Sequence, residues 1–300
     1  MRMQADCVPC LMRRILFQAR LSGGSDDAEI MARCLRVFAD EFEPGLKSVD
    51  VASKVHAECY AALGNDDPYL ELKVLSDEVA SGLLPLAEGM VEGSDNPLHT
   101  ALAVSAAGNI MDFGSGIAID HPDSFSEMFR ELASQGFGLD HTDRLREILD
   151  RDGPVVYIFD NCGECQMDKL VIRQLRRMGK EVVGVVREEP ILNDVSLRDV
   201  GRAGLDAELD AVRGTGAFYV GIDLNQISEE LEEDIARSCV VIAKGMGNYE
   251  SLSDEPLPVP IAHILRAKCI PVASSIGVPV GTNVVLVREP RSERPRARYK

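Results

Sequence analysis

The chain has 300 residues, of which 45% are hydrophobic and 27% charged, a globular composition that allows one large domain or two smaller ones. Its net charge of −17 argues against a nucleic-acid partner, because nucleic-acid binders carry a basic footprint. No run of about 18 uncharged apolar residues and no signal-peptide pattern occurs, so we expect no membrane partner and a cytoplasmic location.

The first half of the chain has the apolar spacing of helices. Gly, Asn, Asp and Pro separate the periodic segments, and no alternation typical of β-strands interrupts them. We therefore predict an all-helical N-terminal region over residues 1–150. The expected helices cover residues 10–21, 28–42, 49–63, 68–87 and 96–107.

The pattern changes near residue 150 to short apolar runs that alternate with helical segments. Such runs are typical of strands buried on both faces, and the alternation predicts parallel strands joined by helical crossovers. We predict a second domain over residues 151–300 with a three-layer α/β/α fold and a mostly parallel sheet. The expected strands are 154–159, 181–186, 240–243, 269–273 and 284–287, and the expected helices are 164–178, 227–238 and 261–268.

Polar side chains follow three of these predicted strands. Asp160 and Asn161 follow the first, Asp194 follows the second, and Lys244 ends the third. Ligands of open parallel sheets bind beyond the carboxyl ends of the strands, so these groups converge on one edge. Carboxylate and amide oxygens suit Mg²⁺ or Mn²⁺, and the ammonium of Lys244 suits phosphate oxygens. We predict a divalent metal on Asp160, Asn161 and Asp194, with Asp160, Asp194 and Lys244 as the catalytic residues.

Taken alone, the Asp-Asn pair at 160–161 and the Asn-Asp pair at 193–194 could each have only a structural role, since such pairs after strands often form turns or helix caps. The convergence of three strand ends favours a site that hydrolyses phosphate monoesters. Haloacid-dehalogenase-type enzymes need a second Asp two residues after the first, and that position is Cys162. Attack by a metal-activated water and a covalent intermediate on Asp160 both remain open.

These residues resemble the damage-control phosphatase family, metal-dependent phosphatases formerly catalogued as domain of unknown function 89. The similarity extends from residue 7 to about 287 and includes the N-terminal CxxC of a prokaryotic subfamily. The motifs are Cys7-x-x-Cys10-Leu11, Gly108-Asn109-Ile110-x-Asp112-Phe113, Asp160-Asn161-x-Gly163-Glu164, Asn193-Asp194-Val195 and Lys244-Gly245-x-Gly247-Asn248-Tyr249.

The resemblance implies an active site between the helical region and the α/β/α domain. Its metal ligands correspond to Asp160, Asn161 and Asp194, and its usual metals are Mn²⁺, Ni²⁺, Co²⁺ or Mg²⁺. The substrate-binding residues that it implies are Asn109, Asp112, Glu164, Lys244 and Asn248.

The family implies a small phosphorylated metabolite as substrate, damaged or surplus to the cell. Its sugar-phosphate branch carries an Arg-Thr-x-Lys motif near the C-terminus, where this chain has the unrelated residues 273–281. We therefore expect aberrant purine nucleotides or their precursors, with a sugar phosphate as the alternative.

Cys7 and Cys10 have the spacing of half a zinc site or of a redox pair, just before a predicted helix whose N-terminus would stabilise a thiolate. A second metal, buried reduced thiols and a redox pair are the three interpretations. The rival functions are accordingly a thiol–disulfide oxidoreductase and a non-enzymatic protein that binds metal or nucleotide.

Overall fold

A computed structural model describes residues 1–21, 27–43, 45–114 and 121–290. In this described part, seven strands form one sheet in the order β1-β7-β6-β5-β2-β3-β4. The strands are β1 (Leu139–Asp140), β2 (Val155–Ile158), β3 (Val182–Val186), β4 (Ala211–Gly214), β5 (Val240–Lys244), β6 (Ile261–Ala267) and β7 (Thr282–Arg288).

The five strands from β6 to β4 run parallel to one another, which confirms the predicted α/β class and mostly parallel sheet. The last strand, β7, runs antiparallel to β6, and the two-residue β1 pairs parallel with β7 at the sheet edge. The sequence analysis placed no strand at β1 or β4. Both are short, and neither contains a buried residue, so the apolar run that marks a central strand is missing.

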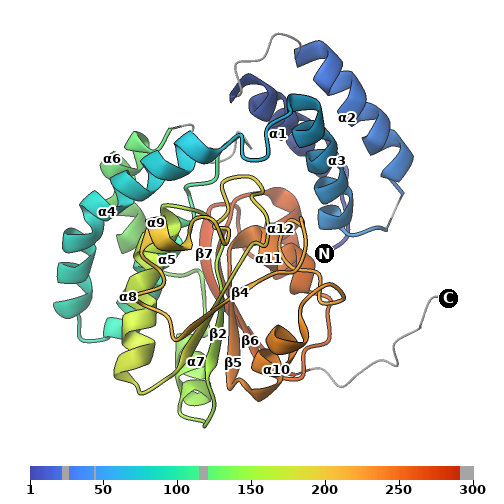
Figure 1. The fold of residues 1–300 in the computed structure, drawn as a ribbon. Coiled ribbons are helices and arrows are strands. Elements are labelled where there is room, and N and C mark those ends of the chain that lie inside the picture. Colours follow the sequence, from blue (N-terminus) through green and yellow to red (C-terminus); the bar gives the residue numbers. More distant parts are fainter. Residues whose placement is uncertain (22–26, 44, 115–120, 291–300) are drawn as a thin grey trace.

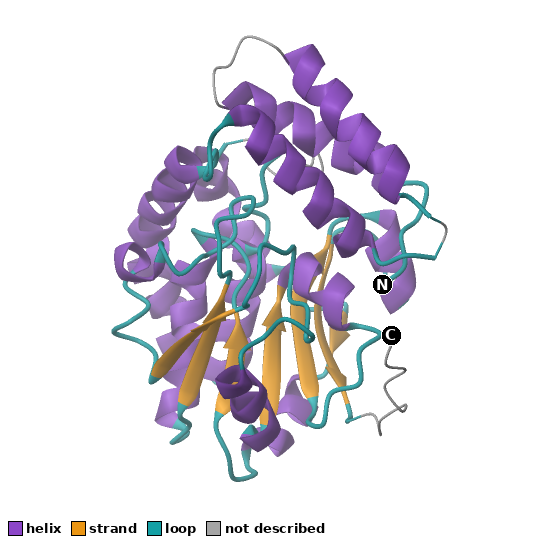
Figure 2. Ribbon diagram, turned by 45° about the vertical axis from the view of Figure 1, so that its right-hand side comes forward, coloured by secondary structure: helices purple, strands orange, loops and turns teal. Residues whose placement is uncertain are grey.

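Helices cover both faces of the sheet, as the two views in Figures 1 and 2 show. The described helices are α1 (Cys7–Leu21), α2 (Asp27–Glu41), α3 (Ser48–Leu63), α4 (Leu70–Glu92), α5 (Pro97–Gly108), α6 (Asp123–Ser134), α7 (Thr142–Leu149), α8 (Glu164–Arg177), α9 (Val200–Ala203), α10 (Glu229–Arg237), α11 (Gly245–Leu252) and α12 (Ile270–Ile276). Within the described residues, none is long and apolar enough to cross a membrane.

Strand β2 shows why the sheet is covered on both sides. Successive strand side chains point to opposite faces. Tyr157 and Phe159 join the core that contains α4, α5 and α8, whereas Val156 and Ile158 join a second core with α10 and α11. A strand that is apolar on both faces must be central, and β2 is hydrogen-bonded to β3 and β5.

Two predicted elements near the C-terminus are interchanged in the structure. Residues 261–267 of the expected helix over 261–268 form strand β6, and residues 270–273 of the expected strand over 269–273 lie in helix α12. Pro271 occupies the first turn of α12, where its missing N–H is harmless and its fixed φ suits a helix. This interchange places Lys268 at the carboxyl end of a strand.

The helices before residue 150 have two different positions. Helices α1, α2 and α3 pack on one another through a small core that includes Ile15, Cys34 and Val55, and they lie above the carboxyl ends of the strands (Figure 1). Helices α4 to α7 instead contribute to the main core beside the sheet. The predicted domain division at residue 150 stays a prediction.

Candidate active site

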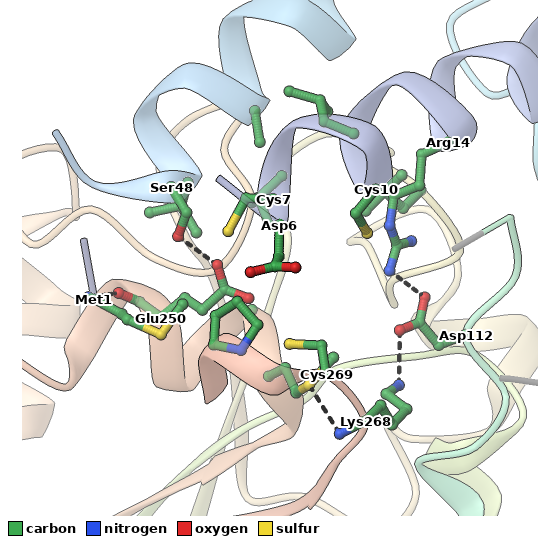
Figure 3. Close-up of a pocket in the computed structure, with 18 of the residues that line it drawn as sticks. Met1, Asp6, Cys7, Cys10, Arg14, Ser48, Asp112, Glu250, Lys268 and Cys269 are labelled. Atoms are coloured by element: carbon green, nitrogen blue, oxygen red, sulfur yellow. Dashed lines mark hydrogen bonds and ion pairs between the residues drawn. The ribbon is translucent and has the colours of Figure 1, made fainter. Parts of the chain in front are cut away.

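A cavity of about 420 Å³ lies between α1, α3 and the carboxyl ends of the strands. Figure 3 shows its lining, with α1 on one side and the side chains of Asp112 and Lys268 on the other. Asp160, Asn161 and Asp194 also line it. The predicted metal ligands therefore line a cavity whose opposite side is formed by α1 and α3.

Main-chain hydrogen bonds hold the loops after β2 and β3 together. Asn161 and Asp194 form an isolated antiparallel bridge. The Val195 N–H donates to the Asp160 carbonyl and the Cys162 N–H to the Asn193 carbonyl, both at 2.8 Å. Two strand ends that are distant in sequence thus present their carboxylates from one rigid piece of backbone.

Gly245, the first residue of α11, allows the Asp160 carboxylate to occupy its position. Its φ of +73° is a left-handed conformation that favours glycine. A Cβ atom there would overlap the carboxylate of Asp160. Glycine is therefore required at position 245 for two reasons: the Asp160 carboxylate occupies the space of a Cβ atom, and the backbone is left-handed.

Arg187, the residue after β3, holds the two acids from the side of the sheet. Its Nε donates to Asp194 Oδ2 at 2.7 Å, its Nη2 lies 3.5 Å from Asp160 Oδ1, and its Nη1 donates to Asn248 Oδ1 at 2.9 Å. The side chain is 1% exposed. The sequence analysis did not single it out, although it follows a predicted strand in the same way as the acids do.

The two acids share a strongly unfavourable environment for negative charge. Burial raises the pKa of Asp160 well above its usual range, and the carboxylates of Asp194 and Glu164 raise it further. Burial also raises the pKa of Asp194, although Arg187 opposes the rise. A bound cation would relieve such a cluster.

A third acid that lines the cavity, Asp112, is instead compensated by two cations. Asp112 Oδ1 lies 2.7 Å from Arg14 Nη2 of α1, and its Oδ2 lies 2.7 Å from Lys268 Nζ at the end of β6 (Figure 3). Burial alone would raise the pKa of Asp112, but the two cations outweigh it and hold the pKa at about 2. Neither Arg14 nor Lys268 was predicted from the sequence as a site residue.

The structure places four predicted site residues, Asn109, Glu164, Lys244 and Asn248, away from the cavity lining. Glu164, Lys244 and Asn248 are each fully buried, and none of them is among the lining residues. Lys244 Nζ lies 2.7 Å from Glu164 Oε1 and 2.9 Å from Asp168 Oδ1, beneath the floor of the cavity. The ammonium that was expected to contact phosphate is thus enclosed by carboxylates.

Asn109, the C-cap residue of α5, also lies beneath the floor. Its Nδ2 donates to Asp160 Oδ2 at 3.0 Å and to Glu164 Oε2 at 2.8 Å. Asn109 therefore approaches the acids from the helical side of the molecule.

Cys7 and Cys10 line the cavity together with Cys269 (Figure 3). Burial raises the pKa of Cys7, and raises that of Cys269 to about 12, so neither is an activated thiolate. The thiolate stabilisation expected from the helix N-terminus is outweighed by burial at Cys7. Among the described residues, no group of three or more His, Cys, Asp or Glu is arranged to hold a metal, which leaves a second metal on these thiols without support.

Comparisons with known proteins agree with this geometry. Residues 3–284 match the model of the damage-control phosphatase ARMT1-like domain. The chain is 35% identical to a damage-control phosphatase of Archaeoglobus fulgidus, over 96% of this chain and 100% of that protein. It is 31% identical to a damage-control phosphatase of Pyrococcus horikoshii, over 95% of this chain and 98% of that protein.

A solved structure adds the fold. The crystal structure of a protein of the DUF89 family from Pyrococcus horikoshii superimposes with a TM-score of 0.84 at 28% identity, and the match covers 95% of this chain and 99% of that chain. The chain belongs to the damage-control phosphatase family with the ARMT1-like domain.

Proposed function

We propose that the protein is a metal-dependent phosphatase that hydrolyses phosphate monoesters of small metabolites in the cytoplasm. The observation that carries the proposal is the cavity itself, where Asp160, Asn161 and Asp194 meet beside Lys268. Two acids and an amide form a metal-binding floor, and a buried ammonium next to it suits an anionic substrate.

The donor set fits a hard divalent cation, because its two carboxylates are buried together and its third member offers an amide oxygen. Asp160, Asn161 and Asp194 would hold the metal. When bound, such a metal polarises a phosphoryl oxygen and lowers the pKa of a coordinated water. Mn²⁺, Ni²⁺, Co²⁺ and Mg²⁺ are the candidates.

The cations of the wall bind the phosphoryl group in this proposal. Lys268 and Arg14 each bind one oxygen of the Asp112 carboxylate. Two cationic donors therefore already lie side by side on the wall where an entering phosphate would bind. They neutralise charge that develops on the transferring group. Lys268 thereby takes the role that the sequence analysis gave to Lys244.

Asp160 is placed to accept the proton of the attacking water, and Arg187 keeps the acid oriented. The new P–O bond forms to the water oxygen while the P–O bond to the ester oxygen breaks, and the ester oxygen leaves as an alcohol with the proton that Asp160 accepted from the water. Direct attack by water needs no covalent intermediate.

The body of the substrate contacts a largely apolar wall. Leu11, Val49, Ala52, Val220 and Met246 all line the cavity. Apolar walls favour a substrate with a flat or apolar body over a polyhydroxyl chain, because buried hydroxyl groups need partners. This supports aberrant purine nucleotides or their precursors as substrates, ahead of sugar phosphates.

The test is hydrolysis of p-nitrophenyl phosphate by the metal-free protein after addition of each candidate metal. We expect stimulation by at least one metal, and its loss in D160N and D194N. The matched control is D234N, which removes a buried acid of α10 that pairs with Arg213 of β4 and with Arg237 of the same helix. Equal metal-stimulated rates in the wild type and both site variants would contradict the proposal.

A further inference from the structure

Directly beneath the cavity floor lies a carboxylate that reaches no solvent. Glu164, the first residue of α8, is fully buried and does not line the cavity. Such a group cannot contact a substrate in this conformation. It must act on the residues that surround it.

Glu164 accepts hydrogen bonds from two side-chain amides through the same oxygen. Asn161 Nδ2 lies 2.9 Å and Asn109 Nδ2 lies 2.8 Å from Glu164 Oε2. Both NH₂ groups also reach Asp160 Oδ2, at 2.9 and 3.0 Å respectively. Since a carboxylate only accepts hydrogen bonds, the NH₂ end of each amide is fixed towards these oxygens.

The oxygen ends of the two amides consequently point elsewhere. Asn109 Oδ1 accepts from the Arg266 N–H at 3.1 Å. Asn161 Oδ1 accepts no hydrogen bond from the described residues, and Asn161 lines the cavity. The amide of Asn161 is therefore oriented with its metal-binding atom free.

Lys244 is the ion-pair partner of Glu164. Its Nζ donates to Glu164 Oε1 at 2.7 Å and to Ser105 Oγ at 2.5 Å, and it pairs with Asp168. Asp168 in turn accepts from Ser105 Oγ at 2.6 Å and from Tyr157 Oη at 2.9 Å. The ammonium thus supplies the positive charge that a buried carboxylate requires.

We propose that Glu164, with Lys244 as its counter-ion, is a positioning residue that turns the amide oxygen of Asn161 towards the metal of the phosphatase site. This inference rests on the proposed function, and it reassigns Glu164 and Lys244 from substrate contact to ligand orientation. Outer-shell partners of metal ligands commonly change metal affinity about 10–100-fold when they are removed.

The substitution E164Q tests the orientation with almost no change in shape. A glutamine carries one acceptor and one NH₂ group. Either its NH₂ faces the Lys244 ammonium, or it faces the two asparagine amides, and both arrangements place donors against donors. We expect Mn²⁺ affinity to fall about 10–100-fold.

Mn²⁺ binding, followed by electron paramagnetic resonance of the free ion, gives a readout that does not depend on activity. D234N is the control for loss of a buried acid, and we expect its Mn²⁺ affinity to match that of the wild type. The double variant E164Q/K244M removes the ammonium, so the glutamine can turn its oxygen to the amides. We expect it to bind Mn²⁺ more tightly than E164Q.

The outcomes separate this inference from the proposed function. Wild-type affinity in E164Q would overturn the inference while the phosphatase proposal stood. If E164Q does not fold, the folded double variant decides, and an Mn²⁺ affinity more than about 100-fold below that of the wild type would overturn the inference. Absence of Mn²⁺ binding and of metal-stimulated hydrolysis in the wild type would overturn both.

Discussion

Replacement of Gly245 by alanine should damage the site through one methyl group. Gly245 has a φ of +73°, and a Cβ atom there would overlap the Asp160 carboxylate. The acid must therefore move, and it would leave the amides of Asn109 and Asn161 to which Oδ2 is hydrogen-bonded. Metal binding and stability should fall together.

The size of the effect follows from two separate contributions. An alanine in the left-handed region costs about 1–2 kcal/mol in the folded state. Weakening the two hydrogen bonds to the buried Asp160 side chain costs about 2 kcal/mol more. A shift of the acid by about 1 Å is expected to lower kcat/KM roughly 100-fold.

Gly179 provides the matched control for this substitution. It has a φ of +79°, and nothing lies within 4 Å of the Cβ that alanine would add. G179A should therefore show the backbone cost in urea denaturation but keep wild-type Mn²⁺ affinity and activity. If G245A bound Mn²⁺ as tightly as G179A does, the steric explanation would be refuted.

Three further variants test the buried polar groups by urea denaturation. D112N should lower the free energy of unfolding by about 3–5 kcal/mol at pH 7, because two buried cations lose their partner. The pKa of the Asp112 carboxyl is about 2, against an ordinary 3.8, so the wild type loses the stabilising charge as pH falls from 4 to 2. The difference in stability between D112N and the wild type should therefore narrow over that range. H263L should raise stability by about 1–3 kcal/mol, because neither ring nitrogen of His263 has a hydrogen-bond partner among the described residues. Burial lowers the pKa of His263 to about 3, so the wild type loses stability as pH falls below 6.5, and the gain should be larger at pH 5 than at pH 7. Y60F should lower the free energy of unfolding by about 1–3 kcal/mol and weaken Mn²⁺ binding, because the Tyr60 hydroxyl accepts from the Leu192 N–H in the loop that carries Asp194. Unchanged Mn²⁺ affinity in Y60F would contradict this last expectation.

Much of the fold could be predicted because local and tertiary signals agree. The run at residues 154–159 is apolar on both faces, and the structure buries both faces of β2. In residues 261–273 the signals conflict, since the apolar stretch 261–267 suits either a strand or a buried helix. Its pairing with β5 and β7 decides for a strand, and no local pattern reveals that pairing.

The same ambiguity explains which cation was missed. Strand ends supply the site, and that rule identified Asp160 and Asp194 in the sequence. Lys268 follows β6 in the same way, but the segment was expected to be a helix, so the rule was not applied to it. Arg14 could not be found in this way, because only the packing of α1 over the strand ends brings it to Asp112.

Lys244 shows a different limit of sequence reasoning. The rule for strand ends gives the position of a Cα atom, but not the direction of a long side chain. Lys244 ends β5 as predicted, yet its Nζ reaches Ser105, Glu164 and Asp168 beneath the floor. Three oxygens that come from α5 and α8 decide where the ammonium lies, and their convergence is a property of packing.

The balance of charge around the cavity connects the metal with the phosphate. Arg14 and Lys268 share Asp112, Arg187 is the ion-pair partner of Asp160 and Asp194, and two further acids, Asp6 and Glu250, also line the cavity. A phosphate dianion alone would therefore add negative charge beside buried carboxylates, whereas a divalent cation relieves those carboxylates and supplies positive charge to the dianion. Each ligand should therefore increase the affinity of the other. By linkage the two increases must be the same factor, which makes metal and substrate phosphate mutually dependent ligands of one cavity.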